Sequence, residues 1–225
     1  YMINLDAMRE VAWLKELASE AHTVKVGVRV NFDLESMCPG EASGGTEGGR
    51  FGFSYENGTF ARVLEELSGI QGVEVSGIHL HCSSKTRSVG IYQAIAEMAC
   101  RLKREYDLHL DYVDIGGGYF GGLSNKPQYA DYLKAVAEIL KKEFDPQHTT
   151  LIVEPGTSLI CPPIEYVTSV TDVKDTNRNR FVITDGSRIH VDPLMSKKSY
   201  FYHVEYEESA KQRMQQKKQV ISGFT

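Results

Sequence analysis

Strand-like and helix-like segments alternate along residues 1–160, and this alternation limits the possible folds more than any other feature of the sequence. Four apolar runs are typical of strands: 23–31, 73–81, 110–115 and 149–154. Three segments of helical periodicity lie between them: 58–68, 88–106 and 127–144. A further helix is expected at 7–22, with Asp6 as its cap. The repeat of about 40 residues favours right-handed βαβ units, in either an open doubly wound sheet or a (β/α)8 barrel.

The pattern changes after Pro162 and Pro163. Three segments then alternate apolar and polar residues with no helix between them: 164–173, 180–185 and 199–206. This is typical of antiparallel strands. We therefore expect a parallel α/β domain at 1–161 and the beginning of a C-terminal β domain at 162–225.

Composition and charge exclude several classes of protein. The chain has 225 residues, 41% of them hydrophobic and 24% charged, and a net charge of −5 with both signs mixed along it. No basic stripe indicates a nucleic-acid partner, and no apolar run approaches the ~18 residues of a membrane span. The cysteines have no CxxC spacing, so we expect reduced thiols in a cytoplasmic protein: Cys38, Cys82, Cys100 and Cys161.

Residues capable of chemistry stand at or just after the carboxyl ends of the predicted strands. They are Arg29, His79, His81, the glycines 116–118 and Glu154. In both candidate folds these strand ends meet on one side of the sheet, where ligands bind. The sequence therefore predicts one ligand site formed by several strand ends.

The run GGGYFG, residues 116–121, follows an apolar strand. Bare glycine backbone allows main-chain N–H groups to approach a phosphate closely. The run matches G-x-G-x-x-G, but a dinucleotide site needs a helix that begins inside the motif. Here LSNKP intervenes, and Pro127 suits the start of the next helix. A phosphate of another kind is favoured, with a simple corner in the chain as the alternative.

The histidines and Glu154 each allow more than one interpretation. His79 and His81 lie two residues apart and share one face of a strand, so they could bind a metal or pack in the core. The sequence offers no convincing third ligand, and we predict no metal. Glu154 ends the apolar run LIVE and is expected to be buried, where a carboxylate needs a partner.

Five short motifs occur in an order that resembles one family. They are RVN (29–31), RFG (50–52), GIHLHCSS (77–84), VDIGGGYF (113–120) and IVEPGTSL (152–159). Together they resemble the fold-type III pyridoxal-phosphate decarboxylases, the diaminopimelate, ornithine and arginine decarboxylases, with an alanine racemase-like barrel. The resemblance runs to TDG at 184–186. It implies a (β/α)8 barrel, a pyridoxal 5'-phosphate cofactor, an amino-acid substrate and a homodimer with shared active sites.

The resemblance implies roles for individual residues. The cofactor phosphate would be held by the backbone of Gly116, Gly117 and Gly118 and by the hydroxyl of Ser84. Glu154 would keep the pyridine nitrogen protonated, so that the ring draws electrons from the substrate α-carbon. His81 would stack on the ring, with His79 packed below it. His81 and Glu154 are thus the expected catalytic residues.

Three more residues complete the expected cofactor site. The resemblance places Gly156 and Thr157 there, after Glu154, and adds Arg29 from the RVN motif. We further expect Arg29 to pair with Asp114 near the strand ends.

The chain departs from the family pattern in lacking a lysine in the context that binds the cofactor aldehyde. Lys25 lies in a strand, but that strand resembles the later RVN strand of the family. Counted this way, the sequence starts near the fourth barrel strand and runs to the eighth. It also ends where the family presents a cysteine-containing active-site segment. We therefore expect a fragment or an excised domain, inactive by itself.

Two further departures concern the substrate. Thr157 stands where diaminopimelate decarboxylases have an arginine, and Asp192 stands where they have another. A carboxylate ~4 Å from a substrate carboxylate costs about 4 kcal/mol at an effective dielectric constant of 20. A cationic side chain, ornithine- or lysine-like, fits Asp192 better. Arg188 and His190 could replace the lost arginines, which keeps diaminopimelate as the alternative.

Three other functions remain open at this point. A catalytically inactive homologue could bind a partner protein, although it would have no reason to keep His81, Glu154 and the glycine run together. A metal-dependent barrel hydrolase could use His79 and His81. A racemase with the related barrel is the third alternative.

Overall fold

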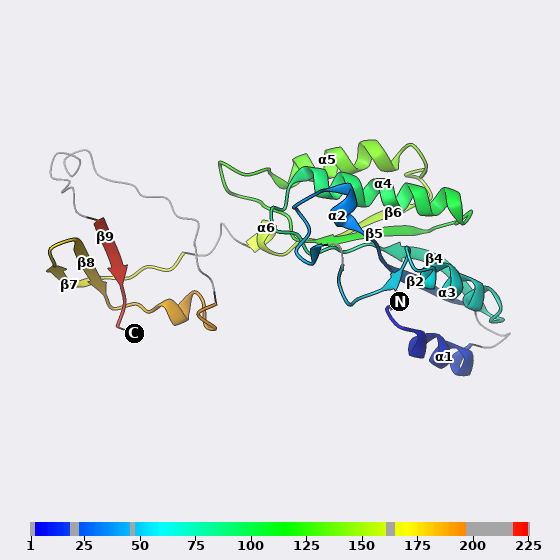
Figure 1. Ribbon diagram of the computed structural model, residues 1–225, viewed down its shortest axis with the longest axis horizontal. Helices are drawn as coiled ribbons and strands as arrows, with labels where there is room; N and C mark the ends of the chain where they lie inside the picture. Colours follow the sequence, from blue (N-terminus) through cyan, green and yellow to red (C-terminus); the bar gives the residue numbers. More distant parts are fainter. Residues whose placement is uncertain (1–2, 19–22, 46–47, 161–164, 197–217, 225) are drawn as a thin grey trace. The chain divides into compact units, whose positions relative to one another are not determined.

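The computed structural model describes residues 3–18, 23–45, 48–160, 165–196 and 218–224. The chain divides into two compact units, residues 1–163 and 164–225. The first unit contains a parallel sheet with helices, and the second contains a small sheet (Figure 1). Among the described residues, no helix is both long and apolar enough to cross a membrane.

The first unit has a six-stranded sheet in which every pair of neighbouring strands is parallel. The strands, in chain order, are β1 (Asn4–Leu5), β2 (Val24–Asn31), β3 (Phe53–Ser54), β4 (Val73–His79), β5 (Tyr112–Gly117) and β6 (Thr150–Glu154). Their spatial order is β1-β2-β4-β5-β6, and β3 pairs with β2. Because the long strands follow each other in chain order without a reversal, the topology is that of a barrel wall and not of a doubly wound sheet.

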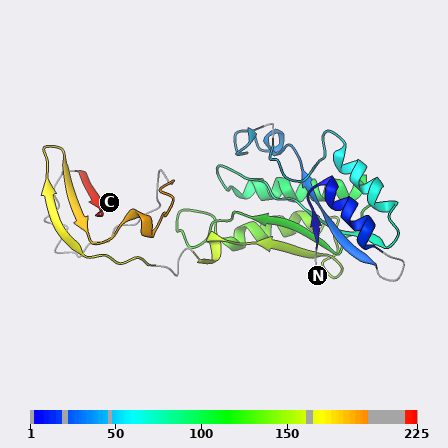
Figure 2. The same cartoon turned by 90° about the horizontal axis from the view of Figure 1, so that it is seen from below.

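Helices lie between the strands of the first unit and after the last of them. They are α1 (Met8–Leu17), α2 (Leu34–Met37), α3 (Thr59–Ser68), α4 (Val89–Glu105), α5 (Tyr129–Leu140) and α6 (Thr157–Ile160). Helices α4 and α5 lie side by side along the sheet, as two views show (Figures 1 and 2). Helix α4 buries the predicted apolar side chains at i, i+4, i+7 and i+11: Ile91, Ile95, Met98 and Leu102. Their burial fixes the strands whose ends form the site.

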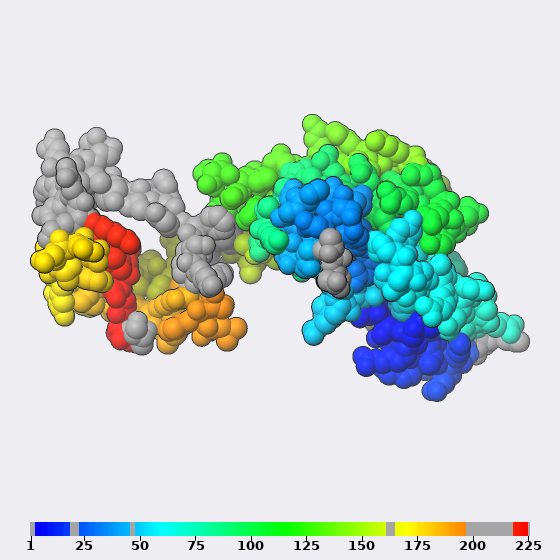
Figure 3. Space-filling view, viewed as in Figure 1, coloured from blue at the N-terminus to red at the C-terminus, as the bar shows by residue number. Residues whose placement is uncertain are grey.

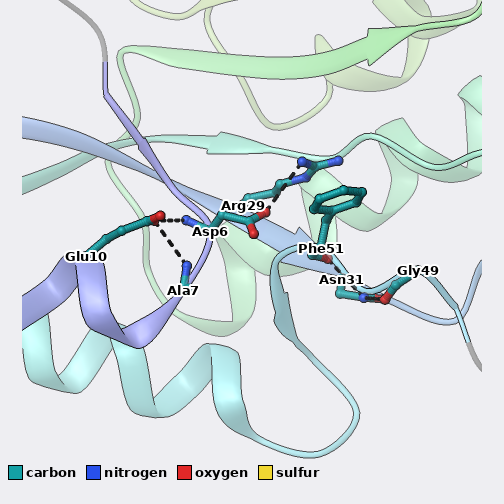
Figure 4. A network of polar contacts seen from close by, with 7 residues as sticks. All are labelled: Asp6, Ala7, Glu10, Arg29, Asn31, Gly49 and Phe51. Atoms are coloured by element: carbon teal, nitrogen blue, oxygen red, sulfur yellow. Dashed lines mark hydrogen bonds and ion pairs between the residues drawn. The ribbon is translucent and has the colours of Figure 1, made fainter.

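The start of α1 differs from the expectation. Asp6 does not cap this helix, because Glu10 does so: its carboxylate accepts hydrogen bonds from the backbone N–H groups of Asp6 (2.6 Å) and Ala7 (3.1 Å). The side chain of Asp6 instead pairs with Arg29, at 3.4 Å (Figure 4). The cap prediction was wrong because the helix begins at Met8, which puts Ala7 at the N-cap position, and because the Asp6 side chain pairs with Arg29.

The second unit contains a three-stranded sheet. Strands β7 (Val170–Asp175) and β8 (Asn179–Thr184) pair in antiparallel fashion, as predicted. Strand β9 (Lys218–Ser222) pairs with β8 in parallel, which makes the sheet mixed instead of purely antiparallel. The predicted segment 199–206 lies outside the described residues. A short 3-10 helix, Arg188–His190, follows β8.

Candidate active site

The carboxyl ends of β4, β5 and β6 meet, as the sequence predicted. His79 on β4 is the register partner of Asp114 on β5, and Gly117 at the end of β5 is the partner of Glu154 on β6. One ligand atom each from His79, Asp114 and Glu154 lie within 4.8 Å of one another. Three adjacent strands therefore bring an imidazole and two carboxylates to one place.

The glycine turn leaves no room for side chains. Gly116 and Gly118 have φ angles of +68° and +97°, which L-residues rarely adopt. A Cβ on Gly117 would lie 2.2 Å from the carbonyl oxygen of Glu154, and one on Gly116 would lie 2.2 Å from Nδ1 of His81. The three glycines thus let β5 approach both β6 and His81 closely.

The turn's N–H groups are arranged differently from the expectation. Gly116 donates to the Asp114 carboxylate (2.8 Å), and Gly117 donates to Nδ1 of His81 (3.2 Å). The pairing of Gly117 with Glu154 directs the Gly118 N–H to the carbonyl oxygen of Glu154, because Pro155 has no N–H to complete the pairing in the other way. The expected convergence of the glycine N–H groups on a phosphate is therefore not seen, because Gly116 and Gly117 hold neighbouring side chains and Gly118 belongs to the β5–β6 ladder.

His81 is held as a neutral ring. Because Nδ1 accepts the Gly117 N–H, the ring proton of the neutral tautomer lies on Nε2. Partial burial lowers the pKa of His81, and the nearby Arg29 charge lowers it further. A neutral flat ring suits stacking better than it suits ion pairing.

Asp114 and His79 are the buried members of the site, with 3% and 8% of their surfaces exposed. Burial raises the pKa of Asp114, and the charge of Glu154 acts in the same direction. Nε2 of His79 is buried and has no hydrogen-bond partner among the described residues. A polar atom in that state costs free energy unless a ligand satisfies it.

Glu154 is exposed, contrary to the prediction that it is buried. Strand β6 is the last strand in the order β1-β2-β4-β5-β6, so within the described part of the chain no further strand covers its outer edge. Exposure of the strand follows from this position. Gly156 and Thr157 beside it are also exposed, and helix α6 begins at Thr157.

Arg29 pairs with Asp6 and lies over the ring of Phe51, 4.6 Å from its centroid (Figure 4). The expected pair of Arg29 with Asp114 was therefore wrong, because β1 brings Asp6 beside the end of β2. In the same view, the side chain of Asn31 donates to the carbonyl oxygens of Gly49 and Phe51. These contacts hold the long loop after β2 against the strand.

A cavity of about 550 Å³ adjoins the site. It lies between the end of β2, the glycine-rich stretches 42–45 and 48–51, and residues 81–83, and both Arg29 and His81 line it. Residues 34–45 pack against the segment between β4 and α4 in the space-filling view (Figure 3), with a bridge between Ala42 and Ser84. The cavity therefore meets the strand-end site at Arg29 and His81.

Ser84 directly follows the cavity-lining residues 81–83 and forms a bridge with Ala42, which lines the cavity. Its hydroxyl accepts the backbone N–H of Arg87 at 3.2 Å, and it keeps its own proton to donate. A phosphate oxygen is one group that the hydroxyl could still bind.

The predicted substrate residues lie in the second unit. Asp192 is buried, and its carboxylate accepts a hydrogen bond from Arg188 at 3.0 Å. His190 contacts the hydroxyl of Tyr166 and the ring of Phe224. The Asp192 charge is therefore balanced by a cation four residues away, a pairing that the sequence argument did not consider.

Sequence reasoning missed two residues of the site. Asp114 was considered only as a partner of Arg29, although its position two residues before the glycine turn indicates that it can hold the turn. Tyr92 was not considered, and its hydroxyl donates to the carbonyl oxygen of Gly117 at 2.9 Å. No local pattern on α4 distinguishes this tyrosine from a core residue.

Residues 1–161 match the sequence model of a protein family, the pyridoxal-binding domain of pyridoxal-dependent decarboxylases. The chain belongs to this family. The cofactor of the family is pyridoxal phosphate, and the enzyme class is that of the carboxy-lyases.

Two curated relatives have similar sequences. The diaminopimelate decarboxylase of Aquifex aeolicus is 25% identical over 190 residues, covering 82% of this chain and 44% of that protein. The diaminopimelate decarboxylase of Bacillus subtilis is 24% identical over 94% of this chain and 50% of that protein. The chain thus spans about half, or less, of the length of these relatives.

Solved structures show the same fold. Diaminopimelate decarboxylase from Methanocaldococcus jannaschii matches with a TM-score of 0.71 and 23% identity, over 87% of this chain and 47% of that one. A lysine/ornithine decarboxylase from Vibrio vulnificus, complexed with putrescine, matches with a TM-score of 0.66 and 20% identity, over 100% and 55%. These are barrel decarboxylases, so the parallel sheet has the predicted barrel-type fold.

Proposed function

We propose that the chain carries the cofactor-binding part of a pyridoxal-phosphate-dependent decarboxylase that acts on an amino acid with a cationic side chain. The observation that supports this most strongly is the convergence of the glycine turn, His81 and Glu154 from three adjacent strands in a chain of this family. The proposal therefore names the reaction of a whole protein of which these residues form one part.

The described residues fit the cofactor. The close packing at Gly116 and Gly117 leaves a turn that a Cβ would block, and the hydroxyl of Ser84 is available as a phosphate donor. Glu154 would accept the hydrogen bond of the pyridine nitrogen. Its exposure gives that carboxylate access to a ligand.

When bound, the cofactor supplies an electron-withdrawing ring for the α-carbon of a substrate that loses CO2. The Glu154 carboxylate would hold a proton on the pyridine nitrogen by a charge-assisted hydrogen bond. His81, kept neutral by burial and by the Gly117 N–H, presents a flat face for stacking and adds no positive charge of its own. Arg29, Gly156 and Thr157 are the remaining proposed cofactor contacts.

The proposed substrate class is lysine- or ornithine-like. It rests on the sequence argument that Asp192 and Thr157 stand where diaminopimelate decarboxylases have arginines. The pairing of Asp192 with Arg188 favours the alternative, since an arginine beside the expected substrate position could bind a distal carboxylate. The relatives named diaminopimelate decarboxylase favour the same alternative. Diaminopimelate is therefore the second candidate substrate.

The proposal extends to a cytoplasmic homodimer with shared active sites. The thiols of Cys38, Cys82 and Cys100 are free, which suits a reducing compartment. Analytical ultracentrifugation of the whole protein tests the dimer, and a monomeric cofactor-loaded protein would contradict it.

Cofactor binding can be tested on the chain itself with pyridoxamine 5'-phosphate. This probe has no aldehyde, so its affinity depends on the phosphate and ring contacts and needs no lysine. We expect calorimetry to show one site, which Glu154→Gln weakens about 10- to 100-fold, because a charge-assisted hydrogen bond contributes about 1.5–3 kcal/mol. Glu74→Gln, an exposed glutamate at the other end of β4, is the matched control. Absence of binding by the wild-type chain would favour the inactive binding homologue.

The substrate is tested with the whole protein. Release of CO2 is measured from lysine, ornithine, arginine and meso-diaminopimelate, in the presence of pyridoxal phosphate. We expect the highest kcat/KM with lysine or ornithine. A clear preference for diaminopimelate would overturn the Asp192 argument and leave the decarboxylase assignment standing.

A further inference from the structure

The site contains more negative charge than the proposed cofactor would balance. Asp114 and Glu154 bring two carboxylates together, and a single protonated pyridine nitrogen would balance only one of them. Asp114 is buried, where an unbalanced charge is costly. A dication would balance both carboxylates.

The third group at this position is an imidazole with an unsatisfied nitrogen. His79 is more than nine-tenths buried, its Nε2 has no hydrogen-bond partner among the described residues, and one of its ring nitrogens lies within 4.8 Å of both carboxylates. His81 is not part of this group, because its Nδ1 accepts the Gly117 N–H. The donor set is therefore one nitrogen and two oxygens.

The three donors are held by a rigid frame. His79 and Asp114 are register partners on adjacent parallel strands, and the pairing of Gly117 with Glu154 fixes the third strand. The Gly116 N–H holds one oxygen of Asp114, as outer contacts commonly do for a carboxylate that binds a metal. Glu154 is exposed and provides a path for an ion to enter.

We propose that His79, Asp114 and Glu154 bind Zn²⁺ when the cofactor is not bound, and that zinc and the cofactor exclude each other at Glu154. The exclusion rests on the proposed function, whereas the zinc site stands on these three residues alone. One imidazole and two carboxylates suit Zn²⁺ better than Mg²⁺ or Ca²⁺, which prefer oxygen donors only.

The geometry requires a small closure. Ligand atoms around a tetrahedral Zn²⁺ lie about 3.4 Å apart, given bonds of about 2.0–2.1 Å. The present separations reach up to 4.8 Å. The exposed side chain of Glu154 can supply most of this movement without disturbing the buried pair. Water would fill the fourth position, as in open zinc sites.

Zinc binding is measured by calorimetry on the chain freed of metal with a chelator, and Co²⁺ absorption reports the coordination geometry. We expect one Zn²⁺ per chain, weakened at least about tenfold by Asp114→Asn and by Glu154→Gln. Asp111→Asn is the matched control, since Asp111 is an exposed aspartate that pairs with Lys25 just before β5. Glu154 is exposed, so Glu154→Gln tests the site even if Asp114→Asn unfolds. Equal zinc affinity in the wild type, Asp114→Asn and Glu154→Gln overturns the proposal.

Competition is measured by titrating pyridoxamine 5'-phosphate without Zn²⁺ and with Zn²⁺ at a concentration that saturates the wild type and leaves Asp114→Asn unloaded. We expect zinc to weaken the probe's affinity at least about tenfold in the wild type and to have no effect in Asp114→Asn, which retains the proposed cofactor contacts. If zinc binds and the probe's affinity is unchanged, the exclusion is overturned. If the probe does not bind at all and the affinity for zinc depends on Asp114, the proposed function is overturned and the zinc site is supported.

Discussion

The hydroxyl of Tyr92 donates a hydrogen bond to the carbonyl oxygen of Gly117 over 2.9 Å. The ring of Tyr92 stacks on that of Tyr119, with centroids 4.4 Å apart, and the hydroxyl of Tyr119 donates to the carbonyl oxygen of Gly116 at 2.9 Å. Two buried tyrosines therefore hold consecutive carbonyl groups of the glycine turn. Their hydrogen bonds fix the turn's orientation relative to helix α4.

Tyr92→Phe should destabilise the chain by about 1–3 kcal/mol, because it leaves the buried Gly117 carbonyl without its donor. It should also weaken binding of pyridoxamine 5'-phosphate, since the turn loses one of its supports. Urea unfolding and calorimetry measure the two effects. Tyr55→Phe is the control, because the Tyr55 hydroxyl donates to Glu105 at the surface. Equal stability of the two variants would show that the Tyr92 hydroxyl does not hold the turn.

Gly117→Ala should lower the stability of the chain much more than Gly156→Ala. A Cβ on Gly117 would lie 2.2 Å from the carbonyl oxygen of Glu154, so β5 and β6 would have to separate, whereas a Cβ on Gly156 has no atom within 4 Å. We expect Gly117→Ala to cost about 1–3 kcal/mol or more and to abolish binding of pyridoxamine 5'-phosphate. Gly156→Ala should leave stability nearly unchanged. Thermal unfolding of both variants checks this, and a stable Gly117→Ala would contradict the close packing of the strand ends.

The wall of the cavity should loosen at acid pH. Glu41 accepts hydrogen bonds from the hydroxyls of Ser88 and Thr86, and these bonds lower the pKa of Glu41. A lowered pKa in the folded state means that the stabilisation is present above about pH 4.3, the usual value for glutamate, and is lost as the pH falls through the folded value. Loosening should therefore appear only below about pH 4.3.

Hydrogen exchange measures this effect at the N–H groups of Ser43 and Lys85, which bond across the two loops. Their protection should fall with pH in the wild type and be low at every pH in Glu41→Gln. Glu65→Gln, at an exposed position of α3, should resemble the wild type. Protection that is the same in Glu41→Gln and the wild type would show that Glu41 does not hold the wall.

The alternation of strands and helices could be predicted because the spacing of apolar residues along the chain differs between the two. The inward face of α4 follows from apolar residues spaced by three and four, and the strands follow from runs of valine and isoleucine. Parallel strands then require their carboxyl ends to lie on one side. This is why the sequence predicts that His79, the glycine turn and Glu154 lie together.

The partners of the charged groups could not be predicted in this way. Asp6 and Arg29 are 23 residues apart and pair because β1 lies beside β2. Glu154 was predicted to be buried from its apolar neighbours, but its exposure is decided by the position of β6 at the end of the sheet. Both outcomes depend on which strands are neighbours, and the sequence does not record that locally.

The sequence by itself determined the order of the elements, the family and the side of the sheet on which the site lies, since each of these follows from short motifs and periodic patterns. Only the tertiary structure decided that Gly116 and Gly117 use their N–H groups on Asp114 and His81, and that Asp114 joins His79 and Glu154. The physical reason is that hydrogen bonds and charge clusters between strands depend on register and on distances of a few ångströms. Register is set by packing across the whole sheet, and no short stretch of sequence contains it.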